Sequence, residues 1–348
     1  MIKHNRPYLD SEDSKAIRQV IDSGYIADGG KVEEFEKALV GYLGKRGFAC
    51  AVSSGTSALF LALYALGVGE NDEVILPTYV CSAVLNAIYM IRAIPVLVDV
   101  NEEDFNISAN AVKKALTRKT RAIIVVHTYG VPVDMDEISR FGVPIIEDCA
   151  QSIGGEYKGN KLGTIGELSV FSFYATKLLA TGHGGMIYSK KKGHIKKIMD
   201  YREYDCHKQY YPRFNFMMSD LQAALGLSQL KKLDYFLERR ALIASTYYEH
   251  LSDKNISYQT MRAKGKLVYY RFIVRTKNIG KVLAKLSNKG IGVLNPLAKY
   301  ELLHNYLGLK NANYQNAEKI ARSTVSLPIY PALTAGELAR ITKALEIL

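Results

Sequence analysis

The sequence predicts an α/β protein with a mostly parallel seven-stranded sheet, helices on both of its faces, and a smaller α+β C-terminal domain. Between about residues 48 and 190, apolar β-branched runs alternate with helical stretches, which is typical of a parallel sheet covered by helices. Beyond about residue 241 this alternation stops. The chain has 348 residues, 48% of them hydrophobic, enough for two cores. We place the domains at 1–240 and 241–348.

Seven apolar runs are the predicted strands of the large domain. They are Phe48–Val52, Glu73–Leu76, Ile94–Asp99, Arg121–His127, Val143–Glu147, Leu168–Tyr174 and Gly185–Ser189. Helices are predicted between them over Thr56–Leu66, Val80–Ile91 and Ala109–Leu116. In such sheets the ligand binds at the carboxyl ends of the strands. Gly55, Pro77, Asp148 and Lys177 all lie at or just after predicted strand ends, so several motifs converge on one edge.

The second half of the chain begins with a long predicted helix. It opens with the capping box Ser219-Asp-Leu-Gln222. Leucines then recur at roughly helical spacing, which predicts core positions at Leu221, Leu225, Leu230, Leu233 and Leu237. The small domain is expected to contain an alternating strand over Val268–Val274, a helix near Lys281–Asn288, and a terminal helix opened by a second capping box, Thr334-Ala-Gly-Glu337.

Composition disfavours several classes of protein. No apolar run approaches the ~20 residues that span a bilayer, and Met1–Pro7 lacks the apolar core of a signal peptide. The four cysteines (Cys50, Cys81, Cys149 and Cys206) are far apart, which indicates neither a disulfide framework nor a zinc site. We therefore expect a cytoplasmic protein with no membrane partner and no bound metal.

The net charge of +12 and the pI near 9.3 raise the question of nucleic-acid binding. The densest basic run is Lys190–Lys197, and such runs usually mark solvated surface. No nucleic-acid-binding motif accompanies it. An enzyme that handles a diphosphate-bearing substrate accounts for the charge equally well, so we expect no nucleic-acid partner.

Two runs of residues carry the predicted chemistry. Asp148 follows the apolar run Val143–Ile146, and Lys177 follows Leu168–Tyr174. A lysine and a carboxylate at the ends of two buried strands suit a pyridoxal phosphate (PLP) site, because the amine forms an imine with the cofactor and the carboxylate keeps the ring nitrogen protonated. Taken singly, such a lysine is more often a surface residue, and such an aspartate more often caps a loop. Strand alternation points the neighbouring Glu147 to the opposite face.

A phosphate site is predicted where Ser53-Ser-Gly-Thr-Ser57 follows a strand and opens an apolar helix. Glycine at 55 allows close backbone approach, and the free N–H groups at the helix start favour an anion. An ordinary helix cap is the alternative. Ser172 could add a hydroxyl, the Gly182–Gly185 segment permits tight packing near Lys177, and Gln151 either donates toward the cofactor ring or simply packs.

Taken in order, these motifs resemble the DegT-type sugar aminotransferases, which are PLP enzymes with the aspartate-aminotransferase fold (fold type I). The resemblance covers nearly the whole chain. It is carried by Ser54–Leu59, Asp72–Pro77, Ile94–Asp99, Glu147–Gln151, Phe171–Lys177, Gly184–Gly185, Phe214–Asp220 and Ser326–Tyr330.

The resemblance implies a role for each matching residue. Lys177 would form the internal aldimine and shuttle a proton, and Asp148 would bind the pyridinium. The residues it assigns to the cofactor are Gly55, Thr56, Ser57, Cys81, Asp148, Gln151, Ser172, Lys177 and Asn215. Asn215 would reach the phosphate of the neighbouring subunit's cofactor, which implies a homodimer with shared sites. Tyr25 is a weaker candidate for substrate contact. Family members typically move an amino group from L-glutamate to a keto group of a nucleotide-linked sugar.

Three departures from the family pattern concern substrate contacts. Cys81 falls where many members stack an aromatic ring on PLP, and whether Tyr79 replaces that ring is open. Met217 stands where arginine is common, and Gly290–Leu297 lacks the usual His-Tyr pattern. Free cyclic ketones are also possible acceptors.

Two other functions are alternatives. A PLP-dependent sugar dehydratase carries histidine at the lysine position, so Lys177 argues against it. A PLP-binding regulator without turnover stays open.

Overall fold

Seven strands form the central sheet, as predicted. The computed structural model describes residues 1–205, 207–254 and 256–347. Cys206 therefore lies outside the described residues. The strands, in sheet order, are β1 (Phe48–Val52), β9 (Gly185–Ser189), β8 (Leu168–Ser172), β5 (Ile145–Asp148), β4 (Thr120–Val126), β2 (Glu73–Pro77) and β3 (Ile94–Val98). Only β9 runs antiparallel to its neighbours. The parallel strands from β8 to β3 therefore end at one edge of the sheet, as the sequence predicted.

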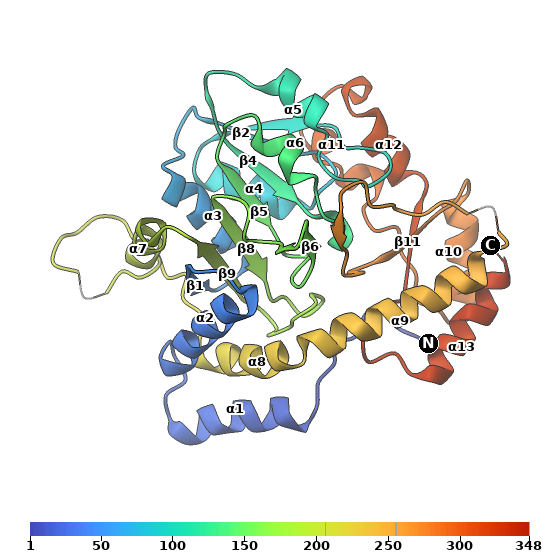
Figure 1. Ribbon diagram of the computed structural model, residues 1–348, viewed down its shortest axis with the longest axis horizontal. Helices are drawn as coiled ribbons and strands as arrows, with labels where there is room; N and C mark the ends of the chain where they lie inside the picture. Colours follow the sequence, from blue (N-terminus) through green and yellow to red (C-terminus); the bar gives the residue numbers. More distant parts are fainter. Residues whose placement is uncertain (206, 255, 348) are drawn as a thin grey trace.

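Helices surround this sheet (Figure 1). One group is α3 (Gly55–Leu66), α4 (Ser82–Met90) and α7 (Lys192–Tyr201), with α3 contacting β8, β9 and both other helices. A second group is α1 (Ser11–Ser23), α2 (Gly30–Leu43) and α8 (Asp220–Lys231), with α2 packed on β1 and α8 packed on α1 and α2. The short helices α5 (Ala109–Ala115) and α6 (Met135–Ser139) contact each other. Eight of the twelve residues of α3 are buried, so this helix belongs to the core of the large domain.

The C-terminal part has its own small antiparallel sheet, made of β11 (Phe272–Arg275) and β12 (Thr324–Leu327). Its helices are α9 (Leu233–Leu251), α10 (Ile279–Asn288), α11 (Leu303–Tyr306), α12 (Gln315–Ala321) and α13 (Ala335–Ala344). A further three-stranded sheet joins β10 (Gly265–Lys266) to β6 (Glu156–Tyr157) and β7 (Asn160–Lys161) of the large domain. Single-turn 3₁₀ segments lie at Thr128–Gly130, Lys299–Glu301, Asn311–Asn313 and Leu345–Ile347.

The N-terminus packs with this C-terminal part. Ile2 is buried in the same hydrophobic cluster as residues of α9, β11, β12 and α13, and its N–H donates to the Gly290 carbonyl at 2.7 Å. Helix α9 runs without a break through residue 240. The division of the chain at 240/241 therefore stays a prediction, with residues at both ends of the chain contributing to the second core.

Both predicted capping boxes are confirmed, at Ser219 before α8 and at Thr334 before α13. The predicted strand over Val268–Val274 is shorter than expected, because β11 begins only at Phe272. The long helix is interrupted at Lys232, and the predicted leucine core is only partly confirmed: Leu233 and Leu237 are buried, whereas the three leucines before them are half-buried. The Lys190–Lys197 run begins on an exposed surface, as expected.

Two further expectations can be compared with the described residues. None of the described helices has the length and apolar character needed to cross a bilayer. The three described cysteines, Cys50, Cys81 and Cys149, are free thiols.

Gly185 allows β9 to approach the start of α3, and this contact can be tested. A Cβ atom at Gly185 would lie 2.3 Å from the Ser54 carbonyl oxygen and 2.8 Å from the Gly55 nitrogen, both of them backbone atoms. We expect Gly185→Ala to destabilise the protein by about 1–3 kcal/mol through this overlap. Urea unfolding measures the change. Gly193→Ala in α7 is the control, since nothing lies within 4 Å of its Cβ position. Equal stability of the two variants would contradict the proposed close approach.

Candidate active site

Three strand or helix ends meet where the chemistry was predicted. Asp148 is the last residue of β5, Ser172 is the last residue of β8, and Gly55 is the first residue of α3. In the parallel ladder, Asp148 is aligned with Val126 of β4 and Val170 of β8, so these strands end at nearly the same level. The residues that the sequence analysis selected at this edge therefore lie close together in the fold.

Asp148 is buried, with 5% of its surface exposed, and only one of its oxygens is used by the protein. Its Oδ1 accepts the backbone N–H of Ala150 at 2.9 Å, and no donor among the described residues reaches Oδ2. Burial raises the pKa of this carboxyl group, and the Ala150 N–H and the Lys177 amine oppose that rise. A buried carboxylate with one open oxygen favours a cationic ligand group, which would keep it charged.

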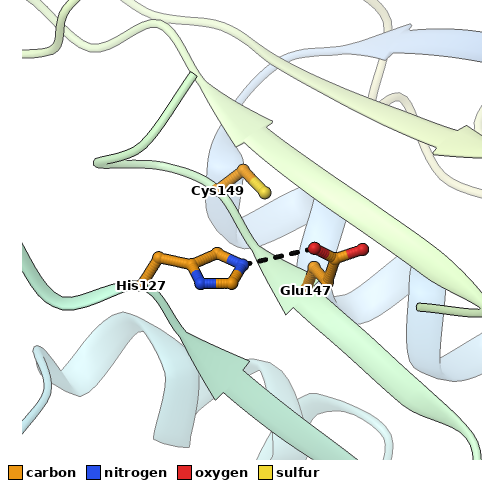
Figure 2. Close-up of side chains that lie close together, drawn as sticks. All are labelled: His127, Glu147 and Cys149. Carbon is orange, nitrogen blue, oxygen red and sulfur yellow. Dashed lines mark hydrogen bonds and ion pairs between the residues drawn. The ribbon is translucent and has the colours of Figure 1, made fainter. Parts of the chain in front are cut away.

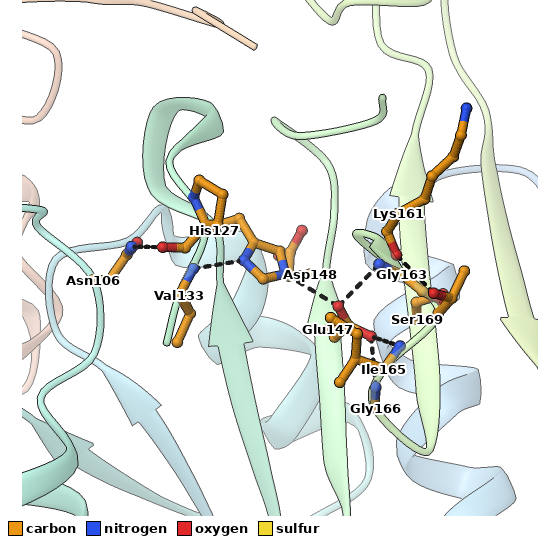
Figure 3. Close-up of polar contacts among 12 residues, drawn as sticks. Asn106, His127, Val133, Glu147, Asp148, Lys161, Gly163, Ile165, Gly166 and Ser169 are labelled. Carbon is orange, nitrogen blue, oxygen red and sulfur yellow. Dashed lines mark hydrogen bonds and ion pairs between the residues drawn. The ribbon is translucent and has the colours of Figure 1, made fainter. Parts of the chain in front are cut away.

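Glu147 points to the other face of β5, as predicted, and is fully satisfied there (Figure 3). Its Oε1 accepts the N–H groups of Ile165 and Gly166 at 2.7 and 2.6 Å, and its Oε2 accepts that of Gly163 at 2.9 Å. The Nε2 of His127 lies 3.3 Å from the same Oε2. Burial alone would raise the pKa of Glu147, but the hydrogen bonds from His127 and the backbone hold it below its usual range.

His127, Glu147 and Cys149 are close enough to hold a metal ion, with ligand atoms within 4.8 Å of one another (Figure 2). The Nδ1 of His127, however, accepts the N–H of Val133 at 3.0 Å, which leaves Nε2 as the donor to Glu147. Any metal would have to displace this bond and the backbone N–H groups on Glu147. The cluster is therefore a hydrogen-bonded support beneath Asp148.

The predicted phosphate site lies where α3 begins. The Oγ of Ser54 caps the helix by accepting the Ser57 N–H at 3.0 Å. A Cβ atom at Gly55 would lie 2.8 Å from Cβ of Ser172 and 3.0 Å from its Oγ, so only glycine fits against this serine. The first N–H groups of the helix have no intrahelical acceptor, and the helix dipole favours an anion there. The Ser57 hydroxyl is already bonded, 2.8 Å from Oγ of Ser54 and 3.0 Å from Oγ of Ser53.

Lys177 lies in a turn after β8, five residues beyond the strand end. The turn is held by backbone hydrogen bonds from Phe173 to Gly184 and from Ala175 to Gly182, at 2.9 and 3.1 Å. The Nζ of Lys177 lies 5.2 Å from the centre of the Tyr270 ring and forms no ion pair with a carboxylate among the described residues. The structure therefore presents a half-buried lysine whose amine has no ion-paired carboxylate in the described part of the chain.

The remaining predicted residues differ in how the fold places them. Gln151 is fixed, because its Oε1 accepts the N–H of Tyr129 at 2.9 Å. Cys81 is exposed and directly precedes α4. Tyr79 is buried and bonded to the Tyr129 hydroxyl at 3.1 Å, so its ring belongs to the core and is not free to replace the aromatic ring that Cys81 lacks.

Two predicted contacts are not formed within one chain. Asn215 is exposed, and its described hydrogen bond accepts the N–H of Met217 at 3.2 Å. Tyr25 is 82% exposed. The roles expected of both residues stay predictions.

Tyr270 and His127 also lie beside the site, and neither was predicted from the sequence. His127 directly follows β4 at the same sheet edge, and a polar residue in that position was a usable signal. Tyr270 comes from the C-terminal part of the chain, and nothing in the local sequence indicates that it contacts Lys177.

The arrangement fits the cofactor that the sequence predicts. It offers a free amine, a buried carboxylate with one open oxygen, and an anion cradle at a helix start. These are the groups that PLP requires for its aldehyde, its ring nitrogen and its phosphate.

The support beneath Asp148 is testable through Glu147. In Glu147→Gln an amide NH₂ replaces one oxygen and faces backbone N–H donors, so at least one buried donor loses its acceptor. We expect a loss of about 3 kcal/mol in the free energy of unfolding, measured with urea. The exposed Glu103→Gln is the matched control. If both variants unfold like the parent protein, the network does not support the site.

Comparisons with known proteins identify the family of this chain. The model of the DegT/DnrJ/EryC1/StrS aminotransferase family matches residues 7–346. The uncharacterized protein MJ1066 of Methanocaldococcus jannaschii is 33% identical over 370 residues, which cover 98% of this chain and 96% of that protein.

Solved structures show the same fold along the whole chain. S. venezuelae DesV, in complex with a ketimine intermediate, has a TM-score of 0.91 at 31% identity, covering 99% of this chain and 98% of its own. Helicobacter pylori PseC, an aminotransferase involved in the biosynthesis of pseudoaminic acid, has a TM-score of 0.91 at 25% identity, with the same coverage. The central sheet is that of fold type I PLP enzymes. The chain therefore belongs to the DegT/DnrJ/EryC1/StrS aminotransferase family and is a transaminase.

Proposed function

We propose that this transaminase moves an amino group from L-glutamate to a keto group of a nucleotide-linked sugar, using PLP bound at the edge of the sheet. The observation that carries the proposal is that, among the described residues, the Lys177 amine forms no ion pair and Oδ2 of the buried Asp148 has no donor. The family match supports the aminotransferase reaction. The likeness to PseC, which acts in pseudoaminic acid biosynthesis, supports a sugar acceptor.

Different residues of the chain would have different roles in this reaction. The phosphate would be held at the start of α3 by Gly55, Thr56, Ser57 and Ser172, and Gln151 would lie against the ring. When bound, PLP supplies an electron sink that stabilises negative charge on the substrate carbon. Asp148 would keep the ring nitrogen protonated, because a cation beside a buried carboxylate favours the charged pair. Lys177 would hold the cofactor and then carry a proton to and from the substrate carbon.

The two alternatives make different predictions for this site. A sugar dehydratase of this fold carries histidine where this chain has Lys177, which disfavours it. A regulator without turnover would keep the cofactor and fail to react with glutamate. The half-reaction with glutamate therefore separates an enzyme from a regulator before any sugar is needed.

The function is tested with protein purified in the presence of PLP. The visible spectrum is recorded before and after L-glutamate is added, and 2-oxoglutarate is assayed as the product. Nucleotide-linked keto sugars and free cyclic ketones are then compared as acceptors by mass spectrometry of the aminated product. A bleached visible band with 2-oxoglutarate release supports the proposed donor, and amination of only the free ketones would contradict the nucleotide-linked acceptor.

Lys177→Ala should lower turnover by about 10³-fold or more, because this change removes both the covalent anchor and the proton carrier. Circular dichroism should show an intact fold, since the Lys177 side chain makes no hydrogen bond or ion pair in the described chain. The exposed Lys192→Ala is the matched control. Full activity in Lys177→Ala would refute the assignment of this lysine.

We further propose a homodimer whose subunits share their sites through Asn215. This residue is exposed, and the backbone of the next residue, Phe216, is bonded to Ser53 and Arg202, which holds Asn215 close to the start of α3. Lys177→Ala and Asn215→Ala should each be inactive alone. Mixed and re-equilibrated, they should recover about a quarter of the parent activity, because half of the dimers then hold one intact site out of two. Mixing Lys177→Ala with Asp148→Asn is the control, since both changes would fall in one chain's half of the site. Activity in Asn215→Ala alone would contradict the shared site.

A further inference from the structure

A segment of the C-terminal part crosses the edge of the sheet beside Lys177. The N–H groups of Val268 and Tyr270 donate to the carbonyls of Gly130 and Tyr129 at 3.3 and 3.1 Å. A Cβ atom at Gly130 would lie 2.8 Å from Cγ2 of Val268, so the two segments are in close contact. This docking fixes Tyr270 against Lys177 and places Arg271 immediately after it.

Arg271 has almost no polar partner in the described chain. Its guanidinium carbon lies 5.7 Å from the centre of the Tyr129 ring and 5.5 Å from that of Tyr270. Its Nη1 lies 3.5 Å from Nε2 of His4, and its buried Nε has no acceptor among the described residues, as is also true of Nε in Arg202 and Arg240. A guanidinium carries five N–H donors, so most of those on Arg271 have no protein acceptor.

Other partly buried arginines form an ion pair or donate hydrogen bonds to the protein, so the lack of such partners at Arg271 points to a ligand. Arg275 pairs with Glu102 at 3.1 Å, and Arg202 donates to the Ala51 carbonyl at 2.6 Å. Arg240, the neighbour of Arg271, donates to three backbone carbonyls at 2.8–3.3 Å. Two aromatic rings thus hold the Arg271 cation in place without providing it with an anion.

The surroundings of Tyr270 are electropositive. Burial would raise the pKa of its hydroxyl, but the charges of Lys177 and Arg271 lower it below its usual value. The pKa of His4 falls to about 3, because His4 is buried and lies beside Arg271 and Arg240. The carboxylate at this edge, Asp148, is the group proposed to face the cofactor ring, which leaves Lys177 and Arg271 with no ion-paired carboxylate among the described residues.

We propose that Arg271, held between Tyr129 and Tyr270, binds a carboxylate of the amino donor beside Lys177. This inference rests on the proposed function and adds a specificity-determining residue to it. The donor's amine must react where the Lys177 amine lies, and its α-carboxylate is only one carbon away from that amine. The diphosphate of a nucleotide-linked sugar is separated from a ring keto carbon by more bonds. A guanidinium also matches a carboxylate with two parallel hydrogen bonds.

The test uses the PLP-loaded enzyme and glutarate, a dicarboxylate that has no amine or keto group and cannot react. Calorimetry measures glutarate binding to the parent protein, Arg271→Gln, Arg271→Lys and Lys281→Gln. We expect Arg271→Gln to weaken binding by about 10- to 100-fold and to raise the KM for L-glutamate similarly. Arg271→Lys should keep part of the affinity. Lys281→Gln is the control, because Lys281 is exposed and lines a separate basic groove.

The outcomes distinguish this inference from the proposed function. The visible spectrum of Arg271→Gln should match that of the parent, because Lys177 and the phosphate cradle are unchanged. If the parent fails to react with glutamate, the proposed function itself fails. If the parent reacts and Arg271→Gln binds glutarate equally well, Arg271 is not the donor's carboxylate site. The remaining comparison is calorimetry with UDP. If Arg271→Gln loses affinity for UDP but keeps its affinity for glutarate, Arg271 binds the phosphates and the proposal is overturned.

Discussion

The site depends on how β5 ends with two adjacent carboxylates. Strand alternation sends Glu147 and Asp148 to opposite faces of the sheet. Three backbone N–H groups and His127 bind Glu147, whereas Asp148 accepts a single hydrogen bond from the residues that the structure describes. A buried carboxylate is costly unless something compensates its charge. Glu147 is compensated by hydrogen bonds within the protein and therefore stabilises the fold. Asp148 is left to bind a ligand.

The functional groups come from segments far apart in the chain, and their positions depend on close backbone contacts. Gly55 fits against Ser172 only because it has no side chain, and Gly185 brings β9 against the start of α3 in the same way. The segment around Tyr270 is fixed by main-chain hydrogen bonds to Tyr129 and Gly130. These contacts are made by backbone atoms, so the functional groups are held as rigidly as the residues of the core.

Local patterns were sufficient to predict the seven strands of the central sheet, both capping boxes, the start of α3, and the opposed faces of Glu147 and Asp148. They failed where a distant partner decides the outcome. Residues 268–270 have an alternating strand pattern, yet their backbone bonds to Tyr129 and Gly130, so β11 starts at Phe272. The leucines of α8 have helical spacing, but the packing against α1 and α2 buries Ala223 and Ala224 instead. No local signal joins Tyr270 to Lys177, because about ninety residues separate them in sequence.

For ligand binding, the balance of charged groups around one site matters more than the net charge of the chain. The net charge of +12 is spread over many solvated side chains, and the exposed basic run near Lys191 includes an ion pair with Glu167 at 2.5 Å. Such charges are screened by salt and do not indicate a ligand. Around Tyr270, by contrast, Lys177 and Arg271 lie near one ring, and neither forms an ion pair with a described carboxylate. Water screens such a half-buried imbalance poorly, so a bound anion would stabilise it where a surface lysine would gain little.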